Sequence, residues 1–332
     1  MLLVAYGTRP EFVKLKPLLP LLDGRIHHRV LFTGQHRLLD GERCDAALGI
    51  AEDGHRLDAV VRSILGADDA VFDGVSAVLV QGDTASAFGV ALAAFHRRIP
   101  VAHLEAGLRT YDLANPFPEE LYRQQISRLA TLHLCPTAHN RANLEAERCP
   151  GRKEVVGNTV LDNLVGLAST YDGPVLISLH RRENQARAPE WIRAFDGLAA
   201  AYPELVFEFV RHPSPDWDWT EGAFERVRVS QPLPHPEMAG RLATCRLIVT
   251  DSGGFQEEGS FLGKRVIVCR RATERPEGLG THLMLCRQPA DLPACFAAAN
   301  QRLVLTAPCP FGDGRSAPRV VTALEEAFSS PV

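Results

Sequence analysis

Short apolar runs alternate along the chain with longer stretches that carry apolar residues at helical spacing. Most of the runs are followed by Gly, Asp or Pro before the next helical stretch begins. Continuous apolar strands between helices are typical of a parallel sheet that is covered on both faces. We therefore predict strands at residues 2–6, 28–32, 77–80, 101–104, 132–135, 175–178, 206–210, 247–250 and 266–268.

The alternation restarts near residue 175. It follows a small polar segment, Gly-Leu-Ala-Ser-Thr-Tyr-Asp-Gly-Pro at residues 166–174, that has the composition of a linker. A length of 332 residues favours two domains. Because strand–helix–strand crossovers are right-handed, each half is expected to form a doubly wound α/β sheet. We predict two Rossmann-like domains, residues 1–167 and 168–332, that face each other across a cleft.

Charge and composition argue against several classes of protein. The net charge of −4 provides no basic stripe for nucleic acid or for an anionic membrane. No apolar run approaches the roughly 18–20 residues of a membrane span. The N-terminus has the pattern of a strand rather than of a signal peptide. The eight cysteines are scattered without a C-x-x-C pair, as expected of reduced thiols in a cytoplasmic protein without a metal site.

Candidate functional residues follow the predicted strands, where sheets of this kind bind ligands. The first strand runs into Gly-Thr-Arg-Pro-Glu at residues 7–11, and Lys14 follows. Arg9 and Lys14 can bring positive charge to a phosphate near the N-terminus of the next helix. Ordinary surface charges in a strand-to-helix loop are the alternative.

Three carboxylates lie at later strand or loop ends. Asp83 follows the strand at 77–80, Glu105 follows the strand at 101–104, and Glu119 lies in Pro-Phe-Pro-Glu-Glu. Carboxylates that converge repel one another, which raises one pKa and supplies a general acid or base. The alternative is that these side chains cap helices or pair with Arg109 and Arg123.

The second half places a histidine beside arginines at a strand end. His180 and Arg181 follow the strand at 175–178, a placement that suits anion binding with proton transfer. His212 follows the next strand and is the weaker candidate.

The strongest local motif is Asp-Ser-Gly-Gly-Phe-Gln-Glu-Glu at residues 251–258, after the strand at 247–250. Adjacent glycines let backbone N–H groups approach a diphosphate at a helix N-terminus, and Ser252 can cap that helix or donate to phosphate. Glu258 lies too deep for the phosphate but can accept ribose hydroxyls. A charged loop with Arg275 follows the strand at 266–268.

Other nucleotide and metal motifs do not fit. No G-x-G-x-x-G follows the first strand and no G-x-x-x-x-G-K-[ST] occurs, so NAD and ATP are not indicated. Asp216-Trp217-Asp218 has the form of a metal-binding D-x-D. It lies in a Pro- and Trp-rich loop rather than at a strand end, which argues against a metal there.

Together these residues resemble the non-hydrolysing bacterial UDP-N-acetylglucosamine 2-epimerases. The matching segments are GTRPEFVKLKPL, TGQH, QGDT, HLEAGLRT, PFPEE, GNTVLDNL, HRREN, DSGGFQEE, TERPE and PFGDG, in family order from residue 7 to about residue 320. HLEAGLRT together with DSGGFQEE and TERPE is highly specific, whereas each alone is only suggestive. The resemblance covers nearly the whole chain.

The resemblance implies a fold like that of the GT-B glycosyltransferases, in which the C-terminal helix crosses back to the first domain. It implies a homodimer without metal or nicotinamide. The first domain would carry the catalytic carboxylates and the dimer contact, and the second would bind UDP. It also implies a two-stage reaction. A base removes the C2 proton as UDP leaves C1, and the 2-acetamidoglucal is then protonated on its opposite face as UDP returns.

The family's functional residues map onto positions of this chain. The acid and base carboxylates map to Asp83, Glu105 and Glu119, and the catalytic histidine to His180. The UDP-binding positions map to Arg9, Ser252, Gly253, Gly254, Glu258 and Arg275, with Lys14, Arg123, Arg181 and His212 nearby.

Two positions depart from the family pattern. Met238 stands where the family usually has an aromatic residue near uracil, and a thioether can still pack on a base. Relatives activated by UDP-N-acetylglucosamine carry Q-H-R-E-M, whereas this chain has Gln-His-Arg-Leu-Leu at residues 35–39.

The function predicted from the sequence is interconversion of UDP-N-acetylglucosamine and UDP-N-acetylmannosamine. The alternatives are a hydrolysing epimerase that releases N-acetylmannosamine and UDP, a 2-epimerase of a related UDP-2-acetamido sugar, a GT-B glycosyltransferase, and an inactive UDP-sugar sensor. The intact set of carboxylates argues against the sensor.

Overall fold

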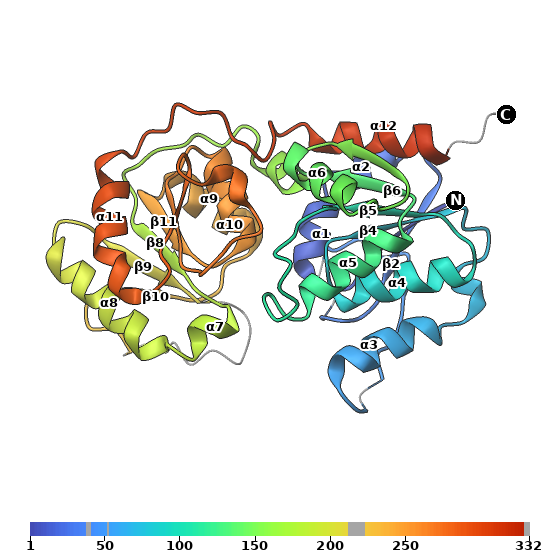
Figure 1. Cartoon of the computed structure of the whole chain (residues 1–332), viewed down its shortest axis with the longest axis horizontal. Helices are drawn as coiled ribbons and strands as arrows, with labels where there is room; N and C mark the ends of the chain where they lie inside the picture. Colours follow the sequence, from blue (N-terminus) through green and yellow to red (C-terminus); the bar gives the residue numbers. More distant parts are fainter. Residues whose placement is uncertain (38–40, 52, 212–222, 329–332) are drawn as a thin grey trace. The chain divides into compact units, whose positions relative to one another are not determined.

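Seven parallel strands form the sheet of the first half of the chain (Figure 1). The computed structural model describes residues 1–37, 41–51, 53–211 and 223–328. The strands of this sheet are β1 (Leu2–Tyr6), β2 (His28–Phe32), β3 (Ala46–Ala47), β4 (Ala77–Gln81), β5 (Val101–Leu104), β6 (Leu132–Cys135) and β7 (Arg152–Val155). Their order is β3-β2-β1-β4-β5-β6-β7, so the chain winds outward from β1 in both directions.

Helices cover both faces of this sheet because its central strands bury side chains on both sides. Alternate residues of β1 face two different cores: Leu2 and Val4 belong to one, and Leu3 and Ala5 to the other. The helices are α1 (Arg9–Leu15), α2 (Leu19–Leu22), α3 (Arg56–Leu65), α4 (Ala85–His96), α5 (Glu119–Leu129), α6 (Ala138–Ala146) and α12 (Ser316–Phe328). Residues of α1, α2 and α12 line the first core, and residues of α3, α4 and α5 line the second.

The second half forms a sheet of six parallel strands. The strands are β8 (Val175–Ser178), β9 (Phe207–Val210), β10 (Arg228–Ser230), β11 (Leu247–Thr250), β12 (Val266–Val268) and β13 (Leu283–Leu285). The described helices of this half are α7 (Arg182–Gln185), α8 (Ala188–Ala201), α9 (His235–Thr244), α10 (Gly253–Phe261) and α11 (Leu292–Gln301). The order β10-β9-β8-β11-β12-β13 is the Rossmann order, with the sequence reversing direction between β8 and β11.

The predicted fold class is confirmed, and each predicted strand is present. Two bounds shift slightly, to Ala77–Gln81 for β4 and Phe207–Val210 for β9. The strands that the sequence did not predict are β3, β7, β10 and β13, which are the edge strands of the two sheets. Edge strands are short and partly exposed: β7 and β10 contain charged residues, and β3 and β13 are only two and three residues long, so none has the longer apolar run on which the prediction depends.

The chain divides into two compact units. Met1–Asn163 and the segment from Gly312 form one unit, and Leu164–Phe311 form the other. The C-terminal helix α12 therefore belongs to the first unit, where it packs on α2. The carboxylate of Asp162 holds the start of α12 by accepting the backbone N–H groups of Ser316, at 3.1 Å, and Ala317, at 2.8 Å.

The polar segment at residues 166–174 is anchored on the second unit. The backbone N–H of Thr170 donates to the carbonyl of Ala243 at 3.0 Å. The ammonium of Lys264 lies 4.2 Å from the centre of the Tyr171 ring and donates to the carbonyls of Thr170 and Cys245. The compact units accordingly divide after Asn163, ahead of the segment with linker composition.

Within the described residues, no helix is long and apolar enough to cross a membrane. All eight cysteines are present as free thiols, five of them buried.

Truncation of the α12 core contact tests the contribution of this helix to the first unit. Leu324 is 1% exposed and lies in the core formed with α1 and α2. We expect Leu324→Ala to lower the free energy of unfolding by about 2–4 kcal/mol because it leaves a cavity. Urea unfolding followed by far-UV circular dichroism measures this. The neighbouring exposed substitution Thr322→Ala should stay within about 0.5 kcal/mol of wild type, and equal losses in both variants would contradict the expectation.

Candidate active site at the carboxyl ends of the strands

The turn after β1 is organised by a buried carboxylate. Glu11, 2% exposed, accepts the backbone N–H groups of Gly7 at 3.0 Å and Thr8 at 2.7 Å, and the Thr8 hydroxyl at 2.8 Å. A Cβ atom at Gly7 would lie 2.0 Å from Oγ of Ser86, so the turn requires glycine there. Burial raises the pKa of Glu11 although these donors act to lower it.

The turn after β4 is tied to the same carboxylate. The hydroxyl of Thr84 donates to Oε1 of Glu11 at 2.6 Å, and the Thr84 hydroxyl oxygen accepts the N–H of Ala87 to cap α4. Gly82 has a φ of +71°, which favours glycine, and its carbonyl accepts from Nε2 of His103 at 2.7 Å. The loops that carry Arg9 and Asp83 are therefore held together through Glu11.

Glu105 follows β5, and side chains from three other segments hold its carboxylate. This group, 7% exposed, forms an ion pair with Lys14 and accepts the amide of Gln81. The amide of Asn158 lies 3.3 Å from its other oxygen. Its backbone has a φ of +66°, an uncommon value for a residue other than glycine. Such left-handed conformations cluster at active sites, because the surrounding structure must enforce them.

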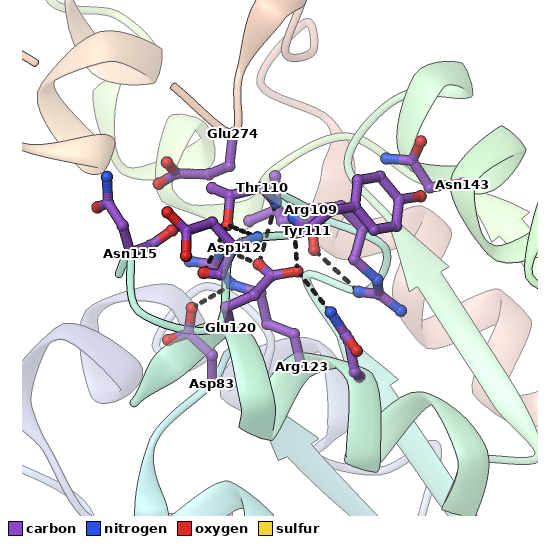
Figure 2. Close-up of polar contacts among 12 residues, drawn as sticks. Asp83, Arg109, Thr110, Tyr111, Asp112, Asn115, Glu120, Arg123, Asn143 and Glu274 are labelled. Atoms are coloured by element: carbon purple, nitrogen blue, oxygen red, sulfur yellow. Dashed lines mark hydrogen bonds and ion pairs between the residues drawn. The ribbon is translucent and has the colours of Figure 1, made fainter. Parts of the chain in front are cut away.

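Asp83 belongs to a chain of charges that runs through α5 (Figure 2). Nε of Arg123 donates to Asp83 at 2.7 Å, and Nη1 of the same guanidinium donates to Glu120 at 3.1 Å. Glu120 is fully buried and also accepts the backbone N–H groups of Thr110 and Tyr111, at 3.0 and 3.1 Å. The loop between β5 and α5 is thereby fixed to the start of α5.

The three predicted carboxylates occupy neighbouring loops of the first unit. Asp83 and Glu105 follow the adjacent strands β4 and β5, and Oε2 of Glu105 lies 3.7 Å from the Cβ position of Gly82. Glu119 is half-buried and begins α5, one residue before Glu120. The alternative reading, an ion pair with arginine, is correct for Asp83 and Arg123. Arg109 pairs instead with Glu147 at 2.7 Å.

In the second unit, His180 and Arg181 are fixed by the strand next to their own. Asp251, fully buried at the end of β11, accepts the backbone N–H groups of both residues at 2.9 Å. Nδ1 of His180 lies 3.2 Å from Oδ1 of the same carboxylate. The Asn184 amide donates to Asp251 at 2.8 Å and completes the set of donors.

The Ser-Gly-Gly turn begins α10 as the sequence indicates. Ser252 is the N-cap residue, and its hydroxyl accepts the N–H of Phe255 at 3.5 Å. A Cβ atom at Gly253 would lie 2.5 Å from Nη1 of Arg275, so this glycine makes room for the guanidinium. Arg275 is buried and pairs with Glu257 at 3.0 Å and Glu274 at 2.5 Å.

The remaining predicted positions lie on α9 and α10 or outside the described residues. Glu258 is 3% exposed and lies 2.8 Å from Nε2 of His235, a neighbour that the sequence analysis did not identify. Met238 is 8% exposed on α9. His212 and the Asp216-Trp217-Asp218 segment lie outside the described residues.

Two arginines of the predicted anion site lack counter-charges within the described part of the chain. Arg9 is the first residue of α1 and is half-buried, with no hydrogen bond or ion pair from its side chain to another described residue. Nε of Arg181 is buried without a hydrogen-bond partner among the described residues. A guanidinium in this state can pair with a phosphate without first breaking an internal ion pair.

Several residues of these networks were missed as site residues in the sequence. Glu11, Gln81, Glu120, Asn158, Asn184 and Asp251 contact the predicted site residues or hold their loops. Gln81 carried a signal, since it is a polar residue at the end of an apolar strand. Asp251 and Asn184 lie inside matched motifs, but their roles depend on contacts between distant segments. No group of three or more potential metal ligands occurs among the described residues.

The comparison with protein families matches the UDP-N-acetylglucosamine 2-epimerase model over residues 22–325. The chain is 35% identical to the UDP-N-acetylglucosamine 2-epimerase of Salmonella typhimurium, with 97% of this chain and 98% of that protein covered. It is 34% identical to the protein of the same name from Bacillus subtilis, with 97% and 94% covered.

Solved structures agree with these relatives. The UDP-N-acetylglucosamine 2-epimerase of Neisseria meningitidis, bound to UDP-N-acetylglucosamine, matches with a TM-score of 0.87 and 29% identity over 98% of this chain and 99% of that one. The enzyme of Methanocaldococcus jannaschii, in complex with UDP-N-acetylglucosamine and UDP, matches with a TM-score of 0.81 and 25% identity over 98% and 99%.

Two buried histidines on β5 and β6 make the stability of the first unit depend on pH. Burial lowers the pKa of His103 to about 4, and burial lowers the pKa of His133 to about 4. Each folded pKa lies below the unfolded value of about 6.5. The stabilising effect is therefore complete above that pH and is lost as the pH falls toward 4, by about 1.4 kcal/mol per pH unit for each histidine.

The variant His103→Gln tests this dependence. Its amide N–H can replace Nε2 as donor to the Gly82 carbonyl but cannot take up a proton. We expect its stability to fall less steeply than that of wild type between pH 6.5 and pH 4.5, because one of the two buried histidines no longer titrates. Urea midpoints across this range measure the slope. The exposed substitution His139→Gln should retain the wild-type slope, and a wild-type slope in His103→Gln would contradict the assignment.

Proposed function

The chain belongs to the UDP-N-acetylglucosamine 2-epimerase family, and from that premise we propose that it interconverts UDP-N-acetylglucosamine and UDP-N-acetylmannosamine without hydrolysis. The observation that carries this proposal is the pair of carboxylates Asp83 and Glu105 on adjacent loops, each held by a cationic side chain. Inversion of one carbon needs a group that removes a proton and a group that returns one on the opposite face. Glu119, at the start of α5, is the third carboxylate of this set.

In the first stage, a carboxylate takes the proton from C2 of the sugar. The electrons of the C2–H bond form the C1–C2 double bond, and those of the C1–O bond leave with UDP. Glu105 suits the role of base because the donors from Lys14, Gln81 and Asn158 orient the carboxylate. All three are side chains, which can exchange partners as a proton arrives. In the second stage, a proton is delivered to the other face of C2 and UDP returns to C1.

The leaving UDP gains negative charge, and the second unit offers donors for it. The N-terminus of α10 presents the backbone N–H groups of Gly253 and Gly254, and Arg181 adds a cation whose Nε has no internal partner among the described residues. Arg9 supplies a second available cation from the first unit. Such preorganised charges stabilise a departing diphosphate without a metal.

The nucleoside is recognised by residues of α9 and α10 in this proposal. Glu258 accepts the ribose hydroxyls, and the Met238 thioether packs against uracil. Arg275 carries two carboxylate partners, Glu257 and Glu274, so it approaches the diphosphate as part of a fixed ion-pair cluster. Lys14 and Arg123 approach the substrate already paired with Glu105 and Asp83. The homodimer and His212 as a ligand-contacting residue stay predictions.

Hydrogen exchange at C2 tests the proposed reaction. The protein is incubated with UDP-N-acetylglucosamine in D₂O with a chelator and followed by NMR. We expect deuterium at C2 and the appearance of UDP-N-acetylmannosamine, because proton removal and return both use solvent-exchanged carboxyls. Free N-acetylmannosamine as the main product would favour the hydrolysing reaction. Absence of both exchange and a new sugar nucleotide would contradict the proposal for this substrate.

Replacement of Glu105 tests the identity of the base. Glu105→Gln keeps the shape of the side chain but removes the charge that pairs with Lys14. We expect kcat to fall by about 10²- to 10⁴-fold, the usual loss on removal of a general base, whereas the Kd for UDP changes by less than about threefold. Kinetics and calorimetric UDP titration measure the two. Glu145→Gln, a loss of an exposed glutamate on α6, is the matched control, and near-normal turnover in Glu105→Gln would exclude this base.

A further inference from the structure

Asp251 faces the side chain of His180 as well as its backbone. Its Oδ2 accepts the N–H of Arg181 at 2.9 Å and the amide of Asn184 at 2.8 Å. Its Oδ1 accepts the backbone N–H of His180 at 2.9 Å and lies 3.2 Å from Nδ1 of the same residue. The carboxylate is fully buried, whereas the imidazole is 23% exposed. The Nδ1 side of the imidazole therefore contacts the buried carboxylate of Asp251, and part of the ring remains exposed to solvent.

This geometry determines where the imidazole proton resides. A carboxylate oxygen accepts hydrogen bonds and an ionised carboxylate has no proton to donate, so the nitrogen that faces it must carry the hydrogen. In neutral imidazole, a proton on Nδ1 leaves the lone pair on Nε2. Nε2 is the nitrogen turned away from Asp251, and it can therefore accept a proton or a hydrogen bond.

A second set of hydrogen bonds keeps Asp251 in this orientation. The indole N–H of Trp191, itself 1% exposed, donates to Oδ1 of Asn184 at 3.0 Å. This contact fixes the amide so that its NH₂ group points to Asp251 and to the carbonyl of Cys269, at 2.9 Å. The carboxylate of Asp251 is consequently held by the oriented amide of Asn184 through one oxygen, while its other oxygen faces the imidazole of His180.

We propose that Asp251 is a positioning residue that holds His180 in the Nδ1–H tautomer, with Nε2 as the proton acceptor toward the substrate. The inference rests on the proposed function, because it takes His180 as one of the groups that act on the UDP-sugar. As UDP returns to C1, its terminal phosphate oxygen gives up a proton to Nε2, so an O–H bond breaks and an N–H bond forms. The imidazolium then lies beside the Asp251 carboxylate, which stabilises that charge. When UDP leaves again, Nε2 returns the proton to the phosphate oxygen.

Three other carboxylates of the chain provide the comparison. Glu11, Glu120 and Asp162 each accept two successive backbone N–H groups, as Asp251 does. At Asp251, an imidazole nitrogen is added to that arrangement. A role limited to holding the loop would be met by the backbone contacts alone, so the position of Nδ1 is the feature that the proposal explains.

The test is the tautomer of His180 in the wild-type protein and in Asp251→Asn. In the variant, the single carbonyl oxygen is expected to face Arg181 and Asn184, which supply two strong donors. The NH₂ group then occupies the place of Oδ1 and donates to Nδ1, which forces the proton of His180 onto Nε2. Long-range ¹H–¹⁵N NMR of histidine-labelled protein, at alkaline pH where imidazoles are neutral, distinguishes the two tautomers. His180→Gln identifies the resonance.

We expect the Nδ1–H form in wild type, the Nε2–H form in Asp251→Asn, and a fall in kcat of about 100-fold or more in the variant. The KM for UDP-N-acetylglucosamine should change by less than about threefold. Asp162→Asn is the matched control, because it alters a carboxylate that also holds two backbone N–H groups but faces no catalytic histidine. It should keep the wild-type tautomer and kcat while its unfolding midpoint falls.

An Nε2–H tautomer in wild type would overturn the inference even if Asp251→Asn fails to fold. A wild-type kcat in a folded Asp251→Asn protein would overturn it as well. The Nδ1–H form in wild type together with no epimerase activity would support the placement of the proton by Asp251 and would overturn the proposed function, so the two failures are distinguishable.

Discussion

The backbone N–H groups of the loops at the strand ends need hydrogen-bond partners, and this requirement shapes both units. Residues beyond the end of a strand have lost their ladder partners, and a backbone N–H that is buried there without an acceptor costs about 1–3 kcal/mol. Carboxylates supply the missing acceptors: Glu11 for the turn after β1, Glu120 for the loop after β5, and Asp251 for the loop after β8. The carboxylates of Glu120 and Asp251 come from other segments and fasten each loop to them.

These carboxylates place negative charge at the strand ends, and that charge explains why arginine and lysine side chains lie beside it. Buried charges are tolerated only when they are paired, so Arg123 joins Glu120 to Asp83, and Arg275 joins Glu257 to Glu274. Lys14 pairs with Glu105 in the same way. Arg9 and Arg181 lie outside this pairing, and within the described part of the chain each keeps a positive charge that no internal carboxylate neutralises.

The sequence predicted the central strands and placed the candidate residues at the strand ends, because both depend on local pattern. Continuous apolar runs identify strands that are covered on both faces, and they fail for edge strands such as β7, whose sequence Arg-Lys-Glu-Val is largely charged. The positions of Asp83, Glu105 and His180 follow from the rule that ligands bind beyond strand ends. The identity of their contact partners does not follow from that rule, because the partners are distant in sequence. Lys14 and Glu105 are 91 residues apart, and His180 and Asp251 are 71 residues apart. Only the folded sheet order brings such residues together.

Burial alone does not separate Glu11 from Glu105, the carboxylate that we propose as the base, whereas the nature of their hydrogen-bond donors does. Glu11 is the more buried of Glu11 and Glu105, but backbone N–H groups and hydroxyls fixed by helix caps occupy its oxygens. A proton on Glu11 would have to displace contacts that hold two loops. The donors of Glu105 include the ends of Lys14, Gln81 and Asn158, which can move without disturbing the backbone. Asp251 combines both kinds of contact: backbone donors fix the position of its carboxylate, and the carboxylate faces the imidazole of His180. A carboxylate can thus take part in proton transfer where side chains hold it, and it can position a partner where the backbone holds it.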